Sequence, residues 1–389
     1  MRRVGVALLW RACAAWVFET PWSLDGSWRA PAPTCGVAKV KCNCNYGYKT
    51  AAWRPSRGKF VASFSKEDSL RTCATLRDEK VFFVGDSLVA QMQEHYGPRV
   101  DAACLDGNVR RPHKKPAYAR CWDPQPTHAF YMLCDGCPGF REGAKKECTY
   151  AKVIDGARDG YTAAVVSFGA HMTTPERLGL TEAYSDALDA LSRAVRGGAF
   201  GDAAAAVDAL ERLSVEGRVV DFNHTKTISI SCDLAAAAHH VELRARERKW
   251  AVLLADAPLG HVGCFNKRRF NASLNPAGLS RAAWNDVSTQ YKFGWDAIPA
   301  INDMASEAFR IAFANSPAPF VRLNANRAFA GHIQAHLAST GLQFKGGAKD
   351  CLHYCGKGPM HVYAEMIHNA LLALGPPSQR FHANRTGSR

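Results

Sequence analysis

The chain of 389 residues is 47% hydrophobic and 22% charged. This composition is that of a folded protein with a sizeable core, and it excludes a collagen-like or largely disordered chain. The formal net charge of +14 suits an anionic glycan, an anionic membrane or a nucleic acid as partner. However, the basic residues are scattered along the sequence and no nucleic-acid-binding motif is present. We therefore expect no nucleic-acid partner.

The chain begins with Arg2 and Arg3, followed by an apolar stretch. Residues 1–22 are therefore predicted to be a signal peptide or a signal anchor that holds the protein to a membrane. An ordinary buried helix is the alternative, because Arg11 leaves the apolar run short for a membrane span. The expected location is the secretory pathway, with the protein either anchored in the Golgi lumen or secreted.

Fourteen cysteines are many for a cytosolic enzyme of this size and favour an oxidising compartment in which disulfides persist. Sequons for N-glycosylation at Asn223, Asn271 and Asn384 agree with such a compartment. Residues 23–75 combine cysteines with proline, glycine and aromatic residues and show little periodicity. We expect them to form a cysteine-rich, loop-rich region that packs on the core.

Apolar segments of strand length alternate with amphipathic segments through residues 76–376, which are predicted to form one folded domain. The predicted strands are 80–84, 163–168, 218–222, 227–231, 250–256 and 320–324. The predicted helices are 175–196, 202–216, 234–249, 298–314 and 360–374. A further amphipathic stretch extends from the first strand to about residue 96. Continuous apolar strands separated by helices indicate a parallel sheet that is covered on both faces. The predicted fold class is α/β, a three-layer α/β/α sandwich with a mainly parallel central sheet. Residues 377–389 are predicted to be a flexible basic tail.

The first predicted strand runs into Gly85, Asp86 and Ser87, directly before the amphipathic stretch. Sites in open α/β sheets form beyond the carboxyl ends of the strands. A serine at such a turn exposes its hydroxyl beside the N–H groups of a helix start, which can stabilise an oxyanion. Gly85 permits a tight turn there. The alternative interpretation is that Asp-Ser simply caps the helix.

A catalytic serine needs a base that a third group holds in place. The segment "KDCLHYC" (349–355) offers such a pair, because Asp350 and His353 stand three residues apart before the last predicted helix. The alternatives are an ordinary surface loop, or metal ligation together with the flanking Cys351 and Cys355. In an oxidising compartment we favour disulfide anchors that fix the loop.

Together, "GDS" after an early strand and "DxxH" before the last helix resemble the SGNH/GDSL hydrolase superfamily. The closer resemblance is to its PC-esterase branch, the trichome-birefringence-like and related polysaccharide or sialate O-acetyltransferases. The residues that carry the resemblance are "DCLHYCGKGP" near the C-terminus, Trp53-Arg54-Pro55, "SLRTCATLRDEKVFFVGDSLVAQ" and "VVSFGAHM" (165–172). It extends, with gaps, from about residue 35 to residue 375.

The resemblance implies that residues 76–376 form an SGNH-like catalytic domain. In it Ser87 is the nucleophile, His353 the base and Asp350 the acid that orients the base. The backbone N–H of Ser87 would be one donor to the oxyanion.

The other expected oxyanion or pocket residues are Gly85, Asp86, Ser167, Gly169 and His171. No clear "GxND" is present, and Gly169 is the candidate for a further oxyanion donor. Ser167 stands where the related branch often has asparagine, and His171 is expected to line the pocket.

The motif "GDSL" continues as Val89-Ala90-Gln91, where the plant acetyltransferases usually carry Arg-Asn. This departure indicates a divergent member of the branch, whose acceptor can differ.

The expected function is serine-dependent acyl transfer, namely O-acetylation of a polysaccharide or glycan hydroxyl through an acyl-serine. The expected partners are an acetyl donor and a glycan acceptor, and no cofactor or metal is expected. The alternatives are a carbohydrate acetylesterase with the same triad, an inactive glycan-binding relative, and a zinc-stabilised binding protein. The last is suggested by the cysteine pairs Cys42–Cys44 and Cys134–Cys137.

Two further groups of residues receive a structural interpretation. Asp256, His261 and Cys264 follow a predicted strand and could border the pocket, but a loop held by a disulfide is favoured. His332 and His336 have a helical spacing that can bind a metal, but a solvated helix face is favoured.

Overall fold

The computed structural model describes two sets of residues. It gives the backbone of 26–29, 52–55 and 117–120, and backbone with side chains for most of 79–96, 154–266 and 274–326, for residue 336, and for 349–354 and 360–381. The expected signal segment 1–22 and most of the cysteine-rich region 23–75 lie outside the described residues. Within that region β1 (Gly26–Arg29) and β2 (Ala52–Pro55) form an antiparallel pair.

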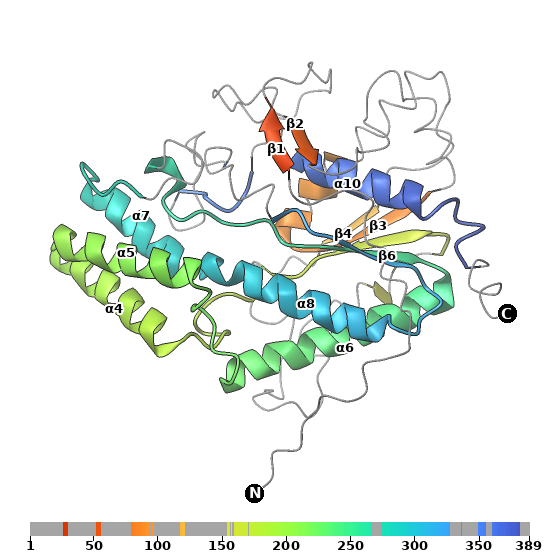
Figure 1. Cartoon of the computed structure of the whole chain (residues 1–389), viewed down its shortest axis with the longest axis horizontal. Helices are drawn as coiled ribbons and strands as arrows, with labels where there is room; N and C mark the ends of the chain where they lie inside the picture. Colours follow the sequence, from red (N-terminus) through yellow and green to blue (C-terminus); the bar gives the residue numbers. More distant parts are fainter. Residues whose placement is uncertain are drawn as a thin grey trace, which may run out of the picture.

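A five-stranded sheet forms the centre of the fold (Figure 1). Its strands are β3 (Val81–Gly85), β4 (Ala117–Arg120), β5 (Ala163–Val166), β6 (Ala251–Ala255) and β7 (Phe320–Leu323). They lie in the order β4-β3-β5-β6-β7, and every neighbouring pair is parallel. β3, β5 and β6 are buried at every position. Such uniformly apolar strands are expected where both faces of a parallel sheet are covered.

The strand order reverses direction between β3 and β5. From β3 the chain passes to β4 on one side, and then returns to β5 on the other side of β3. In open α/β sheets, ligands bind at the carboxyl ends of the two strands that flank such a reversal. The residues that follow β3 and β5 therefore occupy the favoured place for a site.

Helices lie on both sides of the sheet (Figure 1). On one side, α10 (Met360–Ala373) contacts β6 and β7. On the other side, α6 (Thr225–Arg248) packs against α8 (Ile298–Ala312). Next to this pair, α4 (Glu182–Gly197) packs against both α5 (Phe200–Val215) and α7 (Arg281–Lys292). Two short 3₁₀ helices are formed by Cys264–Asn266 and Trp295–Ala297. The predicted α/β class with a parallel sheet is confirmed, and the layers are compatible with a three-layer sandwich.

None of the helices in the described part of the chain is both long and apolar enough to cross a membrane.

Two of the predicted strands are wrong. The segment 227–231 is the first part of helix α6, where His224 caps the helix by accepting a hydrogen bond from the N–H of Lys226. The β-branched residues suggested a strand, but along α6 buried positions recur every three or four residues, at Thr227, Ile230, Leu234 and Ala237, whereas Ile228 is 41% exposed. This burial follows a helical period, so tertiary packing overrides the strand propensity.

The segment 218–222 is the second wrong strand. Its Val220 forms an isolated antiparallel bridge with Leu180, outside the central sheet. Helix α7 was not predicted at all, and Ser280 caps it by accepting a hydrogen bond from the N–H of Ala283.

Part of the predicted basic tail packs against the core. Arg380 is buried and forms an ion pair with Glu79, which lies just before β3. The remaining residues of the tail, from residue 382, lie outside the described residues.

Asp233 on α6 is buried, and within the described structure neither of its carboxylate oxygens has a hydrogen-bond partner. Burial raises the pKa of Asp233 from 3.8 to about 7. In the unfolded chain this carboxyl loses its proton near its ordinary pKa, whereas the folded protein keeps the proton until about pH 7. The contribution of this bound proton to the stability of the fold is fully present below the unfolded pKa, and it is lost as the pH rises through the folded pKa.

Asp233→Asn should therefore gain stability relative to the wild type as the pH rises from 4 to 7. The gain is at most about 1.4 kcal/mol per pH unit, which corresponds to one proton. Urea unfolding at pH 4, 5.5 and 7 measures it, with Asp189→Asn at an exposed position of α4 as the control for the Asp-to-Asn change. A difference for Asp233→Asn that does not vary with pH would contradict this assignment.

Candidate active site

Ser87 lies at the carboxyl end of β3, where the strand turns into a helix. Residue 87 is the first helical residue, and residues 88, 89, 91–93, 95 and 96 are helical as well. Asp86 caps this helix, because its Oδ1 accepts a hydrogen bond from the N–H of Leu88 at 2.9 Å. The cap predicted for Asp-Ser thus belongs to Asp86. The hydroxyl of Ser87 is used elsewhere.

That hydroxyl contacts a histidine 266 residues away in the sequence. The distance from Ser87 Oγ to His353 Nε2 is 2.7 Å. The other ring nitrogen of His353, Nδ1, lies 2.9 Å from Oδ2 and 3.2 Å from Oδ1 of Asp350. The structure therefore brings Ser87, His353 and Asp350 into one hydrogen-bonded series.

The carboxylate of Asp350 determines how the histidine is protonated. Oδ1 of Asp350 also accepts hydrogen bonds from the backbone N–H groups of Leu352 and His353, at 3.1 and 3.0 Å. A carboxylate held in this way only accepts, so a neutral His353 places its proton on Nδ1. Its Nε2 then has a lone pair for the hydroxyl of Ser87, which is the protonation state that a general base needs. The side chains of His353 and Asp350 are 17% and 10% exposed, so the series is partly screened from water.

The expected pocket residues lie at the carboxyl ends of β3 and β5. Beside Gly85 the space is narrow, because a Cβ there would lie 2.3 Å from Val89 and 3.1 Å from the carbonyl oxygen of Ser167. Ser167 continues the pairing of the two strands, since its N–H donates to the carbonyl of Val84. Gly169 lies three residues after the end of β5, which is the strand next to β3.

Glycine is required at position 169 for two reasons. Its φ of +149° is rarely adopted by other residues, and a Cβ there would lie 2.7 Å from Cβ of Ala257. No hydrogen bond in the described part of the chain joins Gly169 or His171 to the series. The carbonyl of His171 accepts a hydrogen bond from Arg177.

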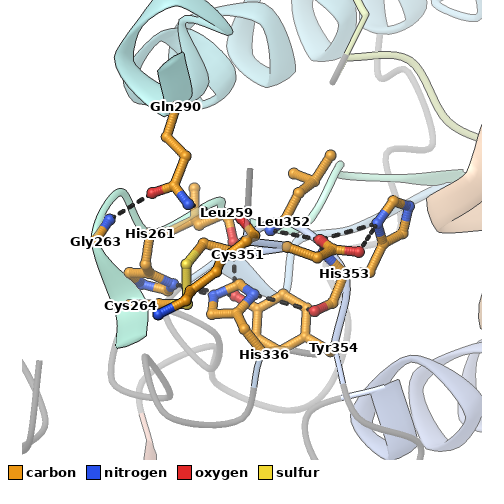
Figure 2. Close-up of a disulfide and its surroundings, with 12 residues drawn as sticks. Leu259, His261, Gly263, Cys264, Gln290, His336, Cys351, Leu352, His353 and Tyr354 are labelled. Atoms are coloured by element: carbon orange, nitrogen blue, oxygen red, sulfur yellow. Dashed lines mark hydrogen bonds and ion pairs between the residues drawn. A yellow bond between two sulfur atoms is a disulfide. The ribbon is translucent and has the colours of Figure 1, made fainter. Parts of the chain in front are cut away.

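The segment 349–354, which carries Asp350 and His353, is attached to the loop after β6 (Figure 2). Cys351 forms a disulfide with Cys264, and its carbonyl accepts a hydrogen bond from the N–H of His261. The hydroxyl of Tyr354 donates to the carbonyl of Leu259 at 2.6 Å. The predicted disulfide-held loop around Cys264 is thus present, and its partner is Cys351.

Helix α7 provides a further attachment through Gln290, which is buried. Its Oε1 accepts from the N–H of Gly263, and its Nε2 donates to the carbonyl of Lys349, both at 2.7 Å. One side chain therefore connects the two segments that the disulfide joins. Figure 2 shows the contact of Gln290 with Gly263 near the disulfide.

His336 does not lie on a solvated helix face, as its spacing from His332 suggested. It is fully buried, and its Nδ1 lies 3.2 Å from the carbonyl oxygen of His353. Its Nε2 lies 2.7 Å from Nδ1 of His261. Burial, followed by the nearby His261, lowers the pKa of His336 well below its usual value. A neutral His336 therefore donates from Nδ1 to the carbonyl and accepts from His261, which fixes the tautomers of both rings.

The end of β6 is fixed by a second set of polar contacts that sequence reasoning missed. Asn302 on α8 accepts from the N–H of Ala257 at 2.8 Å and donates to its carbonyl at 2.9 Å. Arg322 on β7 donates to both carboxylate oxygens of Asp256. Burial raises the pKa of Asp256 to about 6, against the opposing effect of Arg322. These residues support the loop that bears His261, and they have no sequence motif.

Across the described residues, no group of three or more His, Cys, Asp or Glu side chains is arranged to hold a metal ion. The cysteine pairs Cys42–Cys44 and Cys134–Cys137, which suggested zinc, lie outside those residues.

Comparison with models of known protein families and with curated proteins finds no match for this chain.

Replacing both Cys264 and Cys351 by alanine should lower the free energy of unfolding by about 2–4 kcal/mol, because the disulfide restricts the unfolded chain. Urea unfolding under oxidising conditions measures the loss. The double variant avoids leaving a free thiol, and either single variant shows whether such a thiol adds to the effect. An unchanged urea midpoint in the double variant would mean that this disulfide does not stabilise the fold.

Proposed function

We propose that this protein is a serine-dependent acyltransferase of the SGNH type that O-acetylates a polysaccharide or glycan hydroxyl. The observation that carries the proposal is the hydrogen-bonded series Ser87–His353–Asp350 at the carboxyl edge of the parallel sheet. The three residues come from the two motifs that resemble the PC-esterase branch. An inactive glycan-binding relative has no need for all three side chains in this geometry.

In the first half of the reaction, Oγ of Ser87 attacks the carbonyl carbon of an acetyl ester. Its proton passes to Nε2 of His353, and Asp350 stabilises the imidazolium that forms. The negative charge develops on the acetyl oxygen, close to the start of the helix at Ser87. The N–H of Ser87, with Gly169 as the candidate for a second donor, would stabilise that oxyanion. The leaving alcohol takes the proton from His353, and the acetyl group remains on Ser87.

In the second half, a sugar hydroxyl gives its proton to Nε2 of His353 and attacks the acetyl-serine. The tetrahedral intermediate collapses, Oγ of Ser87 regains the proton, and the acetylated glycan leaves. Water in place of the sugar would give acetate, which is the esterase alternative.

A secretory location is part of the proposal, and so is membrane anchoring through residues 1–22. The Cys264–Cys351 disulfide and the disulfide-bonded Cys232 support an oxidising compartment. Glycan acceptors are abundant in the same compartment.

Ser87→Ala should lower kcat/KM for 4-nitrophenyl acetate by about 10³-fold or more, because no nucleophile replaces the hydroxyl. Asp350→Asn should cost about 10³- to 10⁴-fold, since an amide favours the wrong tautomer of His353. Release of 4-nitrophenol gives the rates, and Ser378→Ala at an exposed position is the matched control. Full activity of Ser87→Ala would refute the proposed nucleophile.

Transfer and hydrolysis are distinguished by the product. We expect an oligosaccharide to gain the mass of an acetyl group when the protein is incubated with 4-nitrophenyl acetate and a panel of neutral and sialylated oligosaccharides. Mass spectrometry detects the gain, and Ser87→Ala is the control for non-enzymatic acetylation. Release of acetate with no acetylated sugar from the whole panel would favour the esterase.

A further inference from the structure

Gln91 joins the helix of the nucleophile to the segment of the base. Its Nε2 donates a hydrogen bond to the carbonyl of Tyr354 at 3.0 Å, and its Oε1 accepts one from the N–H of Tyr354 at 3.3 Å. One carboxamide thus pairs with both backbone groups of a single residue. This pairing fixes the position of that residue along the helix as well as its distance from it.

The contact of Gln91 with Tyr354 lies beside the contact of Ser87 with His353. Gln91 follows Ser87 by four residues, so the two side chains lie on the same face of the helix. Tyr354 follows His353 directly. The contact of Gln91 with Tyr354 therefore lies one helical turn from the contact of Ser87 with His353.

The other attachments of this segment hold it to different elements. The disulfide and the hydroxyl of Tyr354 join the segment to the loop after β6. Gln290 joins it to α7, and His336 hydrogen-bonds to the carbonyl of His353. They fix the segment relative to β6 and its neighbours, and within the described residues none of these four contacts joins it to the helix that follows β3.

We propose that Gln91 is a positioning residue for the acyl transfer: its pairing with the backbone of Tyr354 holds Nε2 of His353 within hydrogen-bond distance of Oγ of Ser87. This inference rests on the proposed function, because it assigns a role within the same reaction. A misplacement of about 1 Å between reacting groups costs about 10²-fold in rate. The loss of both hydrogen bonds should therefore reduce the chemical step and leave binding of a small ester nearly unchanged.

Gln91→Met keeps the length of the side chain and removes both hydrogen bonds. We expect kcat for 4-nitrophenyl acetate to fall about 10- to 100-fold, with KM changed less than about twofold. The rate at which a fluorophosphonate modifies Ser87 should fall in parallel, because that reaction also needs the serine and its base.

Gln91→Glu separates positioning from a merely structural role. At neutral pH its carboxylate still accepts from the N–H of Tyr354 but faces the carbonyl oxygen without a proton, so the pairing is incomplete. When the carboxyl is protonated, one oxygen donates and the other accepts, as in the wild type. Its activity relative to the wild type should therefore rise as the pH falls from 8 to 5. For Gln91→Met the same ratio should stay constant.

The matched control is Gln379→Met, at an exposed position next to Arg380. Arg380 binds Glu79 at the amino end of β3, the opposite end of that strand from Ser87. This variant should keep wild-type kcat. Thermal unfolding of each variant shows whether it is folded, and the pH-dependent recovery of Gln91→Glu can be observed only in folded protein.

The proposal is overturned if Gln91→Met keeps at least half of the wild-type kcat, or if the ratio for Gln91→Glu does not change with pH. Either result, with Ser87→Ala inactive, leaves the proposed acyl transfer intact. If the wild type neither turns over the ester nor reacts with the fluorophosphonate at Ser87, both proposals fail together.

Discussion

The parallel alignment of β3, β5 and β6 determines where everything else in this site lies. Because the strands point the same way, Ser87, Gly169 and Asp256 emerge at one edge of the sheet, although they are far apart in the sequence. The reversal of strand order between β3 and β5 places Ser87, the proposed nucleophile, at the point where open sheets bind ligands. The segment 349–354 reaches the same edge after β7. His353, the proposed base, therefore comes from a described segment that forms no strand of this sheet.

Side-chain carboxamides hold the loops at this edge. Gln91 pairs with the backbone of Tyr354, Asn302 with that of Ala257, and Gln290 bridges Gly263 and Lys349. Each carboxamide uses a donor and an acceptor, so it hydrogen-bonds to a backbone N–H and a backbone carbonyl at the same time. Because carboxamides are uncharged, these contacts add no net charge near the imidazolium that the proposed reaction forms. Neutral His336, held against the carbonyl of His353, fits the same constraint.

The sequence predicted the α/β class and the neighbourhood of the site, because these depend on local signals. Uninterrupted apolar runs mark the buried strands, and Asp350 and His353 form their contact within a single turn of chain. The errors arose where packing opposed local propensity, as at 227–231, whose β-branched residues lie in a helix. His336 was misjudged for a related reason. Its partners, His261 and the carbonyl of His353, come from distant parts of the sequence, and no spacing rule connects them.

Gln91 shows how a departure from a motif can be interpreted through its contacts. In sequence, Val89-Ala90-Gln91 replaced the residues usual in the plant acetyltransferases and pointed to divergence. In the structure, the carboxamide of Gln91 hydrogen-bonds to the backbone of Tyr354, next to His353, a contact that the short motif around Ser87 does not encode. An asparagine has the same carboxamide on a shorter side chain, so the difference in residue type does not by itself imply a difference in chemistry. If the proposed glycan acetylation holds, a difference in acceptor choice is therefore better sought in groups that face the acceptor than in Gln91, which is proposed to align Ser87 with His353.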